Sequence, residues 1–212
     1  MKVHRLPNNP LEENTYVVSF ADKRAVIIDC GALYLGEKQR ISEYLSAHEL
    51  TPVAHLLTHG HFDHCFGARY LWEAYGLKPV LAKADAFLFL GQEEQLRKLT
   101  GMTYPEKPLL EFLPLEDYDL TPLHCRYFRT PGHTPGGVCY LFEEDGESAL
   151  FSGDTLFRGS VGRTDHDGGD MLQQLGSIHS QLFTLPESLT VFPGHGPRTT
   201  IGFEKEYNMF LQ

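Results

Sequence analysis

The chain has 212 residues, of which 42% are hydrophobic and 22% charged, so it is long enough for one large domain with a core and is not disordered. A formal net charge of -10 argues against a nucleic-acid-binding protein, which normally carries a basic stripe. The first twenty residues contain no signal-peptide core, and no apolar run approaches the roughly 18 residues of a membrane span. We therefore expect a cytoplasmic protein with no membrane and no nucleic-acid partner. The four cysteines show no CxxC spacing and are predicted to be buried, reduced thiols.

The N-terminal half begins with short strands and continues with alternating helices and strands. β-Branched and aromatic runs predict strands over 2–6, 15–20 and 25–29. Apolar residues at helical spacing predict a helix over 36–50, which ends at a breaker, Thr51-Pro52. A short buried strand over 54–58 and a helix over 66–76 with Gly76 as its C-cap follow. Segment 83–99 is predicted to be a helix or a broken helix, and 101–114 to be irregular.

The C-terminal half returns to strands, predicted over 123–130, 137–142 and 149–153, followed by a helix over 170–183 and a strand over 189–193. Each half therefore starts with strands and ends with a strand that leads into a histidine motif. This pattern predicts an α+β protein, a single domain over 1–212, in which two mixed sheets carry helices on their outer faces. We expect the strand ends of the two halves to converge on one site.

Histidines and aspartates gather in the glycine-rich turns that follow the predicted strands. Five of the eleven histidines lie there together with two aspartates: His59, His61, Asp63 and His64 in THGHFDH, His133 in TPGHTPGG, Asp154 in SGDT and His195 in PGHGP. Glycine permits tight turns in which imidazoles can converge, and loops at strand ends are where rigid scaffolds build their sites. A single histidine of this kind is more often structural, but seven such positions are not independent.

Neutral imidazole and carboxylate are ligands for borderline dications such as zinc, iron or manganese. Seven ligands are too many for one tetrahedral ion and suit two ions that share a carboxylate. His59 and His61 lie two residues apart on an extended stretch, so they can point to the same side and bind one metal. Asp63 and His64 follow where the chain turns, which suits a second metal. The sequence predicts two divalent ions, zinc first, with iron or manganese as alternatives.

These motifs resemble those of the metallo-β-lactamase superfamily, specifically its glyoxalase II-like (hydroxyacylglutathione hydrolase) branch in a short bacterial form. The matching stretches are THGHFDH, PGHTPGG, FSGDTLF and FPGHGP, with VIIDCG at the position of the family's Asp-x-Gly turn, and they span residues 14 to about 203. The resemblance implies a four-layer αββα sandwich. It implies a first metal held by His59, His61 and His133, a second held by Asp63, His64 and His195, and Asp154 as the bridging ligand.

The same resemblance implies a metal-dependent hydrolase that cleaves a thioester such as S-lactoylglutathione. A hydroxide held between the metals, positioned by Asp63 and Asp154, would attack the carbonyl, and the thiolate would leave. Asp29, in VIIDCG, is predicted to orient metal ligands from behind, with an ordinary turn aspartate as the alternative. The substrate is predicted to be a small anionic thioester, and whether the protein is a monomer or a dimer stays open.

Several features depart from the classical glyoxalase II pattern. Those enzymes bind glutathione through a C-terminal helical domain that has no counterpart in this sequence, so segment 83–118 would have to shape the pocket, with Phe87, Phe89 and Tyr104 as candidates and ordinary core positions as the alternative. Arg158 and Arg163 are candidates for a substrate carboxylate, although Arg163 could equally pair with Asp165 or Asp170.

Other reactions remain alternatives. The GRTD segment also resembles persulfide dioxygenases of the superfamily, which use one iron, but those enzymes usually have an acid after the last histidine, where this chain has Gly196-Pro197. That difference favours the dinuclear hydrolase. Another ester or a lactone is an alternative substrate, because the metal site does not select among activated carbonyls. The β-lactamase branches match the motifs less well, since Asp63-His64 and the Asp154 bridge belong to the hydrolase type.

Overall fold

The structure, a computed structural model, describes residues 1–104 and 106–212. It divides into two compact units, Met1–Tyr118 and Asp119–Gln212, and each contains one mixed sheet with its own helices. Residue 105, within the segment predicted to be irregular, lies outside the described residues. The grouping of 1–212 as a single domain stays a prediction.

The sheet of the first unit has the strand order β1-β2-β3-β4-β5-β6. The first three strands are antiparallel neighbours, whereas β3, β4, β5 and β6 run parallel to one another. Their carboxyl ends therefore share one edge of the sheet. The strand bounds are β1 Lys2–Asn8, β2 Glu13–Ser19, β3 Arg24–Ile28, β4 Thr51–Leu56, β5 Pro79–Leu81 and β6 Leu113–Pro114.

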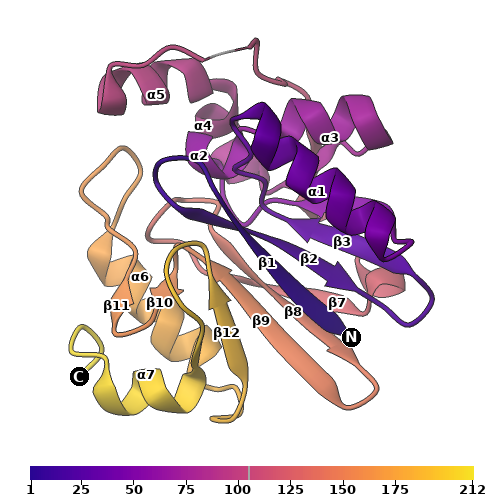
Figure 1. Ribbon diagram of the computed structural model, residues 1–212. Coiled ribbons are helices and arrows are strands. Elements are labelled where there is room, and N and C mark those ends of the chain that lie inside the picture. Colours follow the sequence, from indigo (N-terminus) through magenta and orange to yellow (C-terminus); the bar gives the residue numbers. More distant parts are fainter. Residues whose placement is uncertain (105) are drawn as a thin grey trace. The chain divides into compact units, whose positions relative to one another are not determined.

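Helices α1 and α3 pack on one face of this sheet (Figure 1), where Val17 and Ile27 of the strands form a core with Ile41 of α1 and Leu71 of α3. Fully burying such side chains stabilises the fold by about 1.5–3 kcal/mol each. Helix α3 ends at Gly76 in the left-handed conformation, φ 70°, as predicted. The bounds are α1 Leu35–Ala47, α2 Phe62–Cys65, α3 Ala68–Tyr75, η1 Lys83–Asp85, α4 Ala86–Leu90, α5 Gln92–Thr100 and η2 Leu115–Asp117.

The sheet of the second unit has the order β13-β12-β9-β8-β7. Strand β12 runs parallel to β9, and β8 is antiparallel to both β9 and β7, so β7, β9 and β12 all point the same way. Their carboxyl ends again share one edge. The bounds are β7 Cys125–Arg129, β8 Val138–Glu144, β9 Glu147–Gly153, β12 Thr190–Pro193 and β13 Thr199–Thr200, with a separate hairpin of β10 Leu156–Phe157 and β11 Ser160–Val161.

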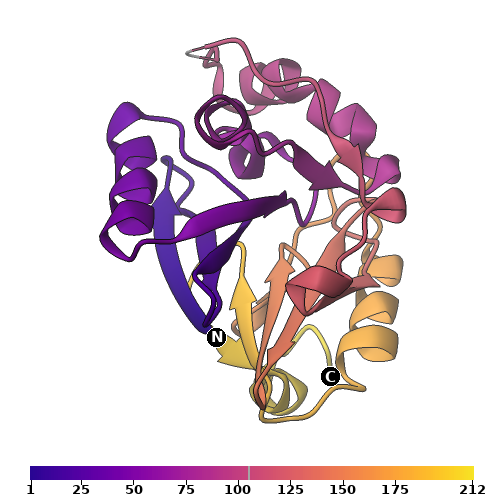
Figure 2. The ribbon, with the colours of Figure 1, turned by 90° about the vertical axis from the view of Figure 1, so that its right-hand side faces the viewer.

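Helix α6, with the π-helical turn η4 that continues it, and helix α7 cover one face of this second sheet (Figure 2). Leu141 and Val191 of the strands pack there against Ile178 and Ile201 of the helices. Side-chain caps start both helices: Asp170 accepts from the Gln173 amide, and Thr200 from that of Phe203. The bounds are η3 Thr121–Leu123, α6 Met171–Ser177, η4 Ile178–Leu182 and α7 Ile201–Tyr207.

Most of the predicted elements are present, and the α+β class with two mixed sheets is confirmed. Segment 83–99 is a broken helix, interrupted at Gly91. Helix α1 ends at Ala47, before the predicted breaker Thr51-Pro52, and these two residues form the start of β4, where they pair with β3. The sequence reading missed the short strands and α7, which carry too few residues for a clear periodicity. No helix in the described part of the chain could cross a membrane.

The four cysteines are buried and none forms a disulfide among the described residues, as predicted. Burial raises the pKa of the Cys139 thiol to about 11. Burial likewise raises the pKa values of Cys30, Cys65 and Cys125 above the ordinary range of a thiol.

Candidate metal centre

In the first unit, four predicted metal ligands gather in the turn that follows β4. His61 precedes α2, and Asp63 and His64 lie on it. The His59 ring centroid lies 4.8 Å from that of His61 and 4.2 Å from that of His64. Asp63 Oδ2 is 3.8 Å from His64 Nε2. His59, Asp63 and His64 are buried, so the turn concentrates imidazole and carboxylate donors away from bulk water.

Asp29 holds these ligands from behind, because it follows β3 at the same edge at which β4 ends. Its carboxylate accepts from the Thr58 amide at 2.7 Å, from the Thr58 hydroxyl at 2.8 Å and from His64 Nδ1 at 2.9 Å. Since the Thr58 hydroxyl donates its hydrogen to Asp29, it accepts from His59 Nδ1 at 3.0 Å. Both histidines thus carry their proton on Nδ1, which leaves Nε2 as the atom that can bind a metal.

A second buried carboxylate supports the same turn. Asp85 follows β5, the next parallel strand along the edge, and its Oδ2 accepts from the Gly60 amide at 2.9 Å. Gly60 lies between two of the predicted ligands, and a Cβ at this position would stand 2.8 Å from the Asp85 carbonyl oxygen. The close approach requires glycine here. Asp85 was not among the predicted site residues.

In the second unit, Asp154 lies between two histidines. Its Oδ2 is 3.6 Å from His133 Nε2 and 3.7 Å from His195 Nε2. The topology explains the meeting: Asp154 directly follows β9, His195 follows the neighbouring parallel strand β12, and His133 follows β7, which points the same way. Both distances exceed a normal hydrogen bond, and a carboxylate oxygen beside two imidazole nitrogens is a donor set that divalent ions accept.

His133 is oriented as the histidines of the first unit are. Its Nδ1 donates to the carbonyl oxygen of Arg163 at 2.7 Å, so Nε2 is the nitrogen on the side of Asp154. The donor sets of both units therefore fit divalent metals: His59, His64 and His133 present Nε2 with Nδ1 engaged, and Asp63 and Asp154 stand beside them as carboxylates.

The family model of the metallo-beta-lactamase superfamily matches residues 8–195. The chain belongs to this superfamily. The probable metallo-hydrolase YqgX of Bacillus subtilis is 36% identical, and the hydroxyacylglutathione hydrolase GloC of Haemophilus influenzae is 32% identical; each alignment covers 100% of this chain and 98% of the relative. Membership supports a metal-dependent hydrolase that acts on a small molecule.

Solved structures of the superfamily match over the full length. The structure of the B3 metallo-beta-lactamase BLEG-1 has a TM-score of 0.87 and 36% identity, with 100% of both chains covered. That of TTHA1623 in a di-iron-bound form has a TM-score of 0.84 and 38% identity, covering 98% of this chain and 100% of the other. The predicted metallo-β-lactamase fold is thereby confirmed.

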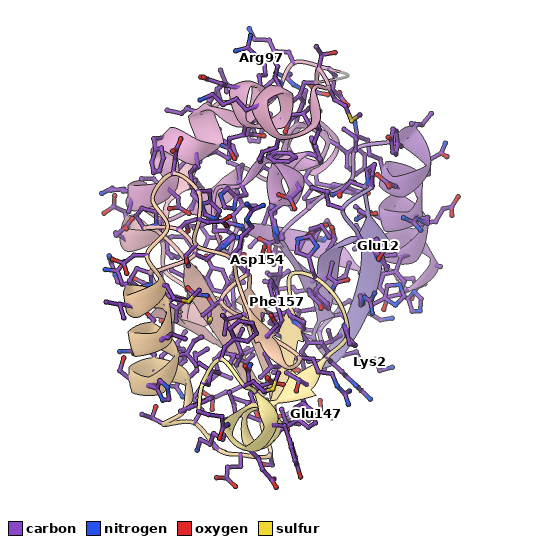
Figure 3. All side chains as sticks on the ribbon, turned by 90° about the vertical axis from the view of Figure 1, so that its left-hand side faces the viewer. Lys2, Glu12, Arg97, Glu147, Asp154 and Phe157 are labelled. Carbon is purple, nitrogen blue, oxygen red and sulfur yellow. The ribbon has the colours of Figure 1, made fainter. Side chains whose placement is uncertain are left out.

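The two arginines predicted as substrate contacts have different neighbours: Arg158 lies over an aromatic ring, and Arg163 forms an ion pair. Arg158 is exposed, and its guanidinium lies 4.9 Å above the Phe203 ring. Arg163 pairs with exposed Asp165 at 2.7 Å, which is one of the two structural pairings that the sequence left open. Phe157, labelled beside Asp154 in Figure 3, contacts the His195 ring edge-on at 6.3 Å between centroids.

The three aromatic candidates of segment 83–118 also separate. Phe89 is a core residue, fully buried against Phe112, so its suggested place in a pocket is wrong. Phe87 is 50% exposed on α4. The Tyr104 ring lies tilted against that of Phe66, with centroids 5.1 Å apart, and lines a surface cavity of about 440 Å³ together with residues of α5. These positions leave Phe87 and Tyr104 accessible to a ligand.

Three buried or half-buried polar residues of this superfamily member contact the predicted ligands or their turns and were not predicted: Glu13, His166 and Gln174. A carboxylate oxygen of Glu13 lies within 4.8 Å of donor atoms of Asp29 and His64, and burial raises the pKa of Glu13 well above the ordinary value of a glutamate. His166 Nε2 is 3.4 Å from His133 Nδ1. Gln174 contacts the backbone of two ligand turns. Glu13 lies on β2 and Gln174 on α6, away from the glycine-rich turns after strands. His166 does lie in such a turn, after β11, but that strand has only two residues and was not recognised in the sequence.

Proposed function

We propose that the chain is a dinuclear metallohydrolase that cleaves a thioester such as S-lactoylglutathione. In this proposal His59, His61 and His133 bind the first ion, Asp63, His64 and His195 bind the second, and Asp154 bridges them. The observation that carries the proposal is the carboxylate of Asp154, one oxygen of which lies 3.6 Å and 3.7 Å from the Nε2 atoms of two histidines assigned to different ions. Zinc is the proposed metal.

When bound, a pair of divalent ions lowers the pKa of a shared water and polarises a carbonyl oxygen. The chain's own residues keep the ligands ready for this chemistry. Asp29 fixes the Nδ1 protons of His64 directly and of His59 through Thr58, and the Arg163 carbonyl does the same for His133. Asp63 and Asp154 add the negative charge that a pair of dications requires. A thiolate leaves readily because thiol pKa values are near 8.5, so no protein acid is needed.

The thioester is proposed from two observations. GloC, named as a hydroxyacylglutathione hydrolase, is similar over the whole chain. Arg158 and Arg163 are exposed cations on the segment that follows Asp154, where they can meet an anionic substrate. We propose a small anionic thioester as the substrate, while the location in the cytoplasm and the choice between monomer and dimer stay predictions.

One other reaction and one other metal have a specific observation in their favour. BLEG-1 is described as a B3 metallo-beta-lactamase and is 36% identical, which places β-lactams among the substrates to test although the motifs favour the hydrolase type. TTHA1623 was solved with two irons, so iron is an alternative to zinc. The persulfide dioxygenase remains a candidate because of the GRTD segment alone. The similarity to the ETHE1 structure, at 24% identity, shows the fold and adds nothing about the reaction.

The deciding experiment is metal analysis of the purified chain together with assays for S-lactoylglutathione hydrolysis, nitrocefin hydrolysis and oxygen uptake with a persulfide. Two metals per chain and thiol release establish the proposed function. One iron with oxygen uptake would identify a dioxygenase instead. Two metals with nitrocefin cleavage and no thiol release would retain the centre and reject the thioester.

The role of the arginines is tested separately. Arg163→Ala removes the guanidinium but keeps the carbonyl that orients His133, so we expect an increase in KM for the anionic thioester, by about tenfold for the loss of one charge-assisted contact, and unchanged metal content. Asp165→Ala is the matched control, because it releases Arg163 from its pair. An unchanged KM in Arg163→Ala would remove this residue from the substrate site.

A further inference from the structure

One fully buried glutamine connects the two ligand turns on either side of β8 and β9 in the second unit. Gln174 lies on α6 with 0% exposure. Its Oε1 accepts from the His133 amide at 2.6 Å. Its Nε2 donates to the carbonyl oxygen of Thr155 at 2.7 Å and to that of Asp154 at 3.3 Å. A single side chain thus contacts the backbone of two residues assigned as metal ligands.

The chemistry of the amide suits this position. A primary amide offers an acceptor and two donors without charge, so it can satisfy one N–H and two C=O groups at once. A hydroxyl has one hydrogen to donate, a carboxylate has none, and an ammonium cannot accept. A buried polar group left without these partners is destabilising, so the three contacts make the position specific for an amide.

Helix α6 also packs closely on the His133 turn, which prevents the amide from moving away. Gly132, at φ +144°, lies so near the helix that a Cβ there would stand 2.2 Å from the Gln174 Cα. The Asp170 amide donates to the Gly132 carbonyl at 2.8 Å, and the Ser177 hydroxyl donates to the Pro131 carbonyl at 2.6 Å. The His133 turn is therefore fixed to α6. Of the three residues of α6 and its N-cap that bond to this turn here, Asp170, Gln174 and Ser177, Gln174 is the one whose side chain also bonds to the Asp154 turn.

We propose that Gln174 is a positioning residue that sets the separation of His133 from Asp154 and so tunes the affinity of the metal centre. The inference rests on the ligand assignment of the proposed function. Residues that orient metal ligands from outside typically change metal affinity or activity by about 10–100-fold when substituted. Unlike Asp29, Gln174 acts through the backbone of the ligands and contributes no charge.

Two substitutions test the amide. Gln174→Glu keeps the length and the acceptor but places an oxygen against the two carbonyl oxygens, and Gln174→Leu removes all three contacts. Gln173→Leu is the matched control, since Gln173 is the adjacent residue of α6 and its side chain is exposed. Ser177→Ala is a second control that loses one bond to the His133 turn without affecting the Asp154 turn.

The measurement is the Kd for Zn²⁺, by competition with a chelator on the full chain, with the Tm of each metal-free variant. We expect the Kd to rise about 10–100-fold in both Gln174 variants, to stay unchanged in Gln173→Leu and to change less in Ser177→Ala. A lower metal-free Tm with unchanged Kd would make Gln174 a structural residue and overturn the proposal. If Gln174→Leu does not fold, the isosteric Gln174→Glu decides.

This test is separate from that of the proposed function. Because the readout is zinc affinity, it gives its answer even if the wild-type chain cleaves no thioester. Where hydrolysis is present, a loss in kcat at constant KM would agree with misplaced ligands.

Discussion

The ligand turns of the two units are supported by different chemistry. In the first unit, two buried carboxylates hold the turn 59–64: Asp29 through His64 and Thr58, and Asp85 through the Gly60 amide. In the second unit, the neutral amide of Gln174 and the Arg163 carbonyl hold His133 and the turn that begins at Asp154. Charge-assisted hydrogen bonds are stronger than neutral ones but depend on protonation. The first unit should therefore be the more sensitive of the two to the loss of a charged side chain.

The largest expected effect comes from the ligand that the proposal shares between both ions. Asp154→Ala should lower the metal content to one ion or none per chain and reduce hydrolysis by roughly 10³-fold, since metal-assisted charge stabilisation supplies several kcal/mol. Metal analysis and kcat measure both. A variant that keeps two ions would contradict the bridging role of Asp154.

Asp29→Asn tests whether charge holds the first turn. The substitution preserves size but replaces one acceptor oxygen, so the Nδ1 protons of His59 and His64 lose their fixed partner, and the Kd for Zn²⁺ should rise by about 10–100-fold. Asp22→Asn is the matched control, because Asp22 is exposed and its carboxylate pairs with Arg24 in the turn between β2 and β3. Equal zinc affinity in both variants would mean that Asp29 is an ordinary turn aspartate.

Asp85→Asn should have a smaller effect, because asparagine can still accept from the Gly60 amide. The difference between a charged and a neutral acceptor is about 1 kcal/mol, which corresponds to a rise of about fivefold in the zinc Kd. Asp117→Asn, which changes an exposed carboxylate paired with Lys83, serves as the control. A larger rise of the zinc Kd in Asp85→Asn than in Asp29→Asn would mean that Asp85 contributes more to zinc affinity than Asp29, against the expectation.

His55 provides the pH test of the first unit. It is fully buried beside Ile27, neither ring nitrogen has a hydrogen-bond partner among the described residues, and burial lowers its pKa to about 3. In the unfolded chain His55 binds a proton below about pH 6.5, whereas in the folded chain it binds one only below about pH 3. The free energy of unfolding therefore falls as the pH drops from 6.5 to 3. Below about pH 3, His55 is protonated in both states, and the free energy of unfolding decreases no further through this residue.

The substitution His55→Leu should remove this loss. Between pH 7 and pH 5 the wild type should lose about 2 kcal/mol more unfolding free energy than the variant, as measured by urea denaturation of the metal-free chains. Because the histidines proposed as metal ligands are present in both chains, their titration cancels in the difference. Parallel pH profiles would show that His55 has a polar partner in solution.

The elements that carry the predicted ligands were the easiest to predict from the sequence. The apolar runs before THGHFDH and SGDT are long enough to be recognised as strands, and the glycines mark the turns after them. Asp85 could not be found in the same way, because β5 has only three residues and the turn after it holds no glycine. It shares the edge of the sheet only because β5 pairs with β4, and that register is a tertiary fact.

Gln174 illustrates a second limit. On a helix, a buried glutamine has the same spacing as an apolar core residue, and its partners are backbone atoms of turns 41 and 19 positions away in the sequence. Nothing in the local pattern distinguishes it from exposed Gln173. By contrast, Asp29 was predicted to orient ligands from its place at a strand end, and its carboxylate accepts three hydrogen bonds from Thr58 and His64.

The burial of the four cysteines has a consequence for an enzyme whose proposed product is a thiol. Released thiols oxidise to disulfides, which exchange with accessible thiolates to give mixed disulfides. All four side chains are buried and hold raised pKa values, so neither access nor the thiolate form is available to them. The chain should therefore resist S-glutathionylation and keep its activity as the thiol pool around it becomes oxidised.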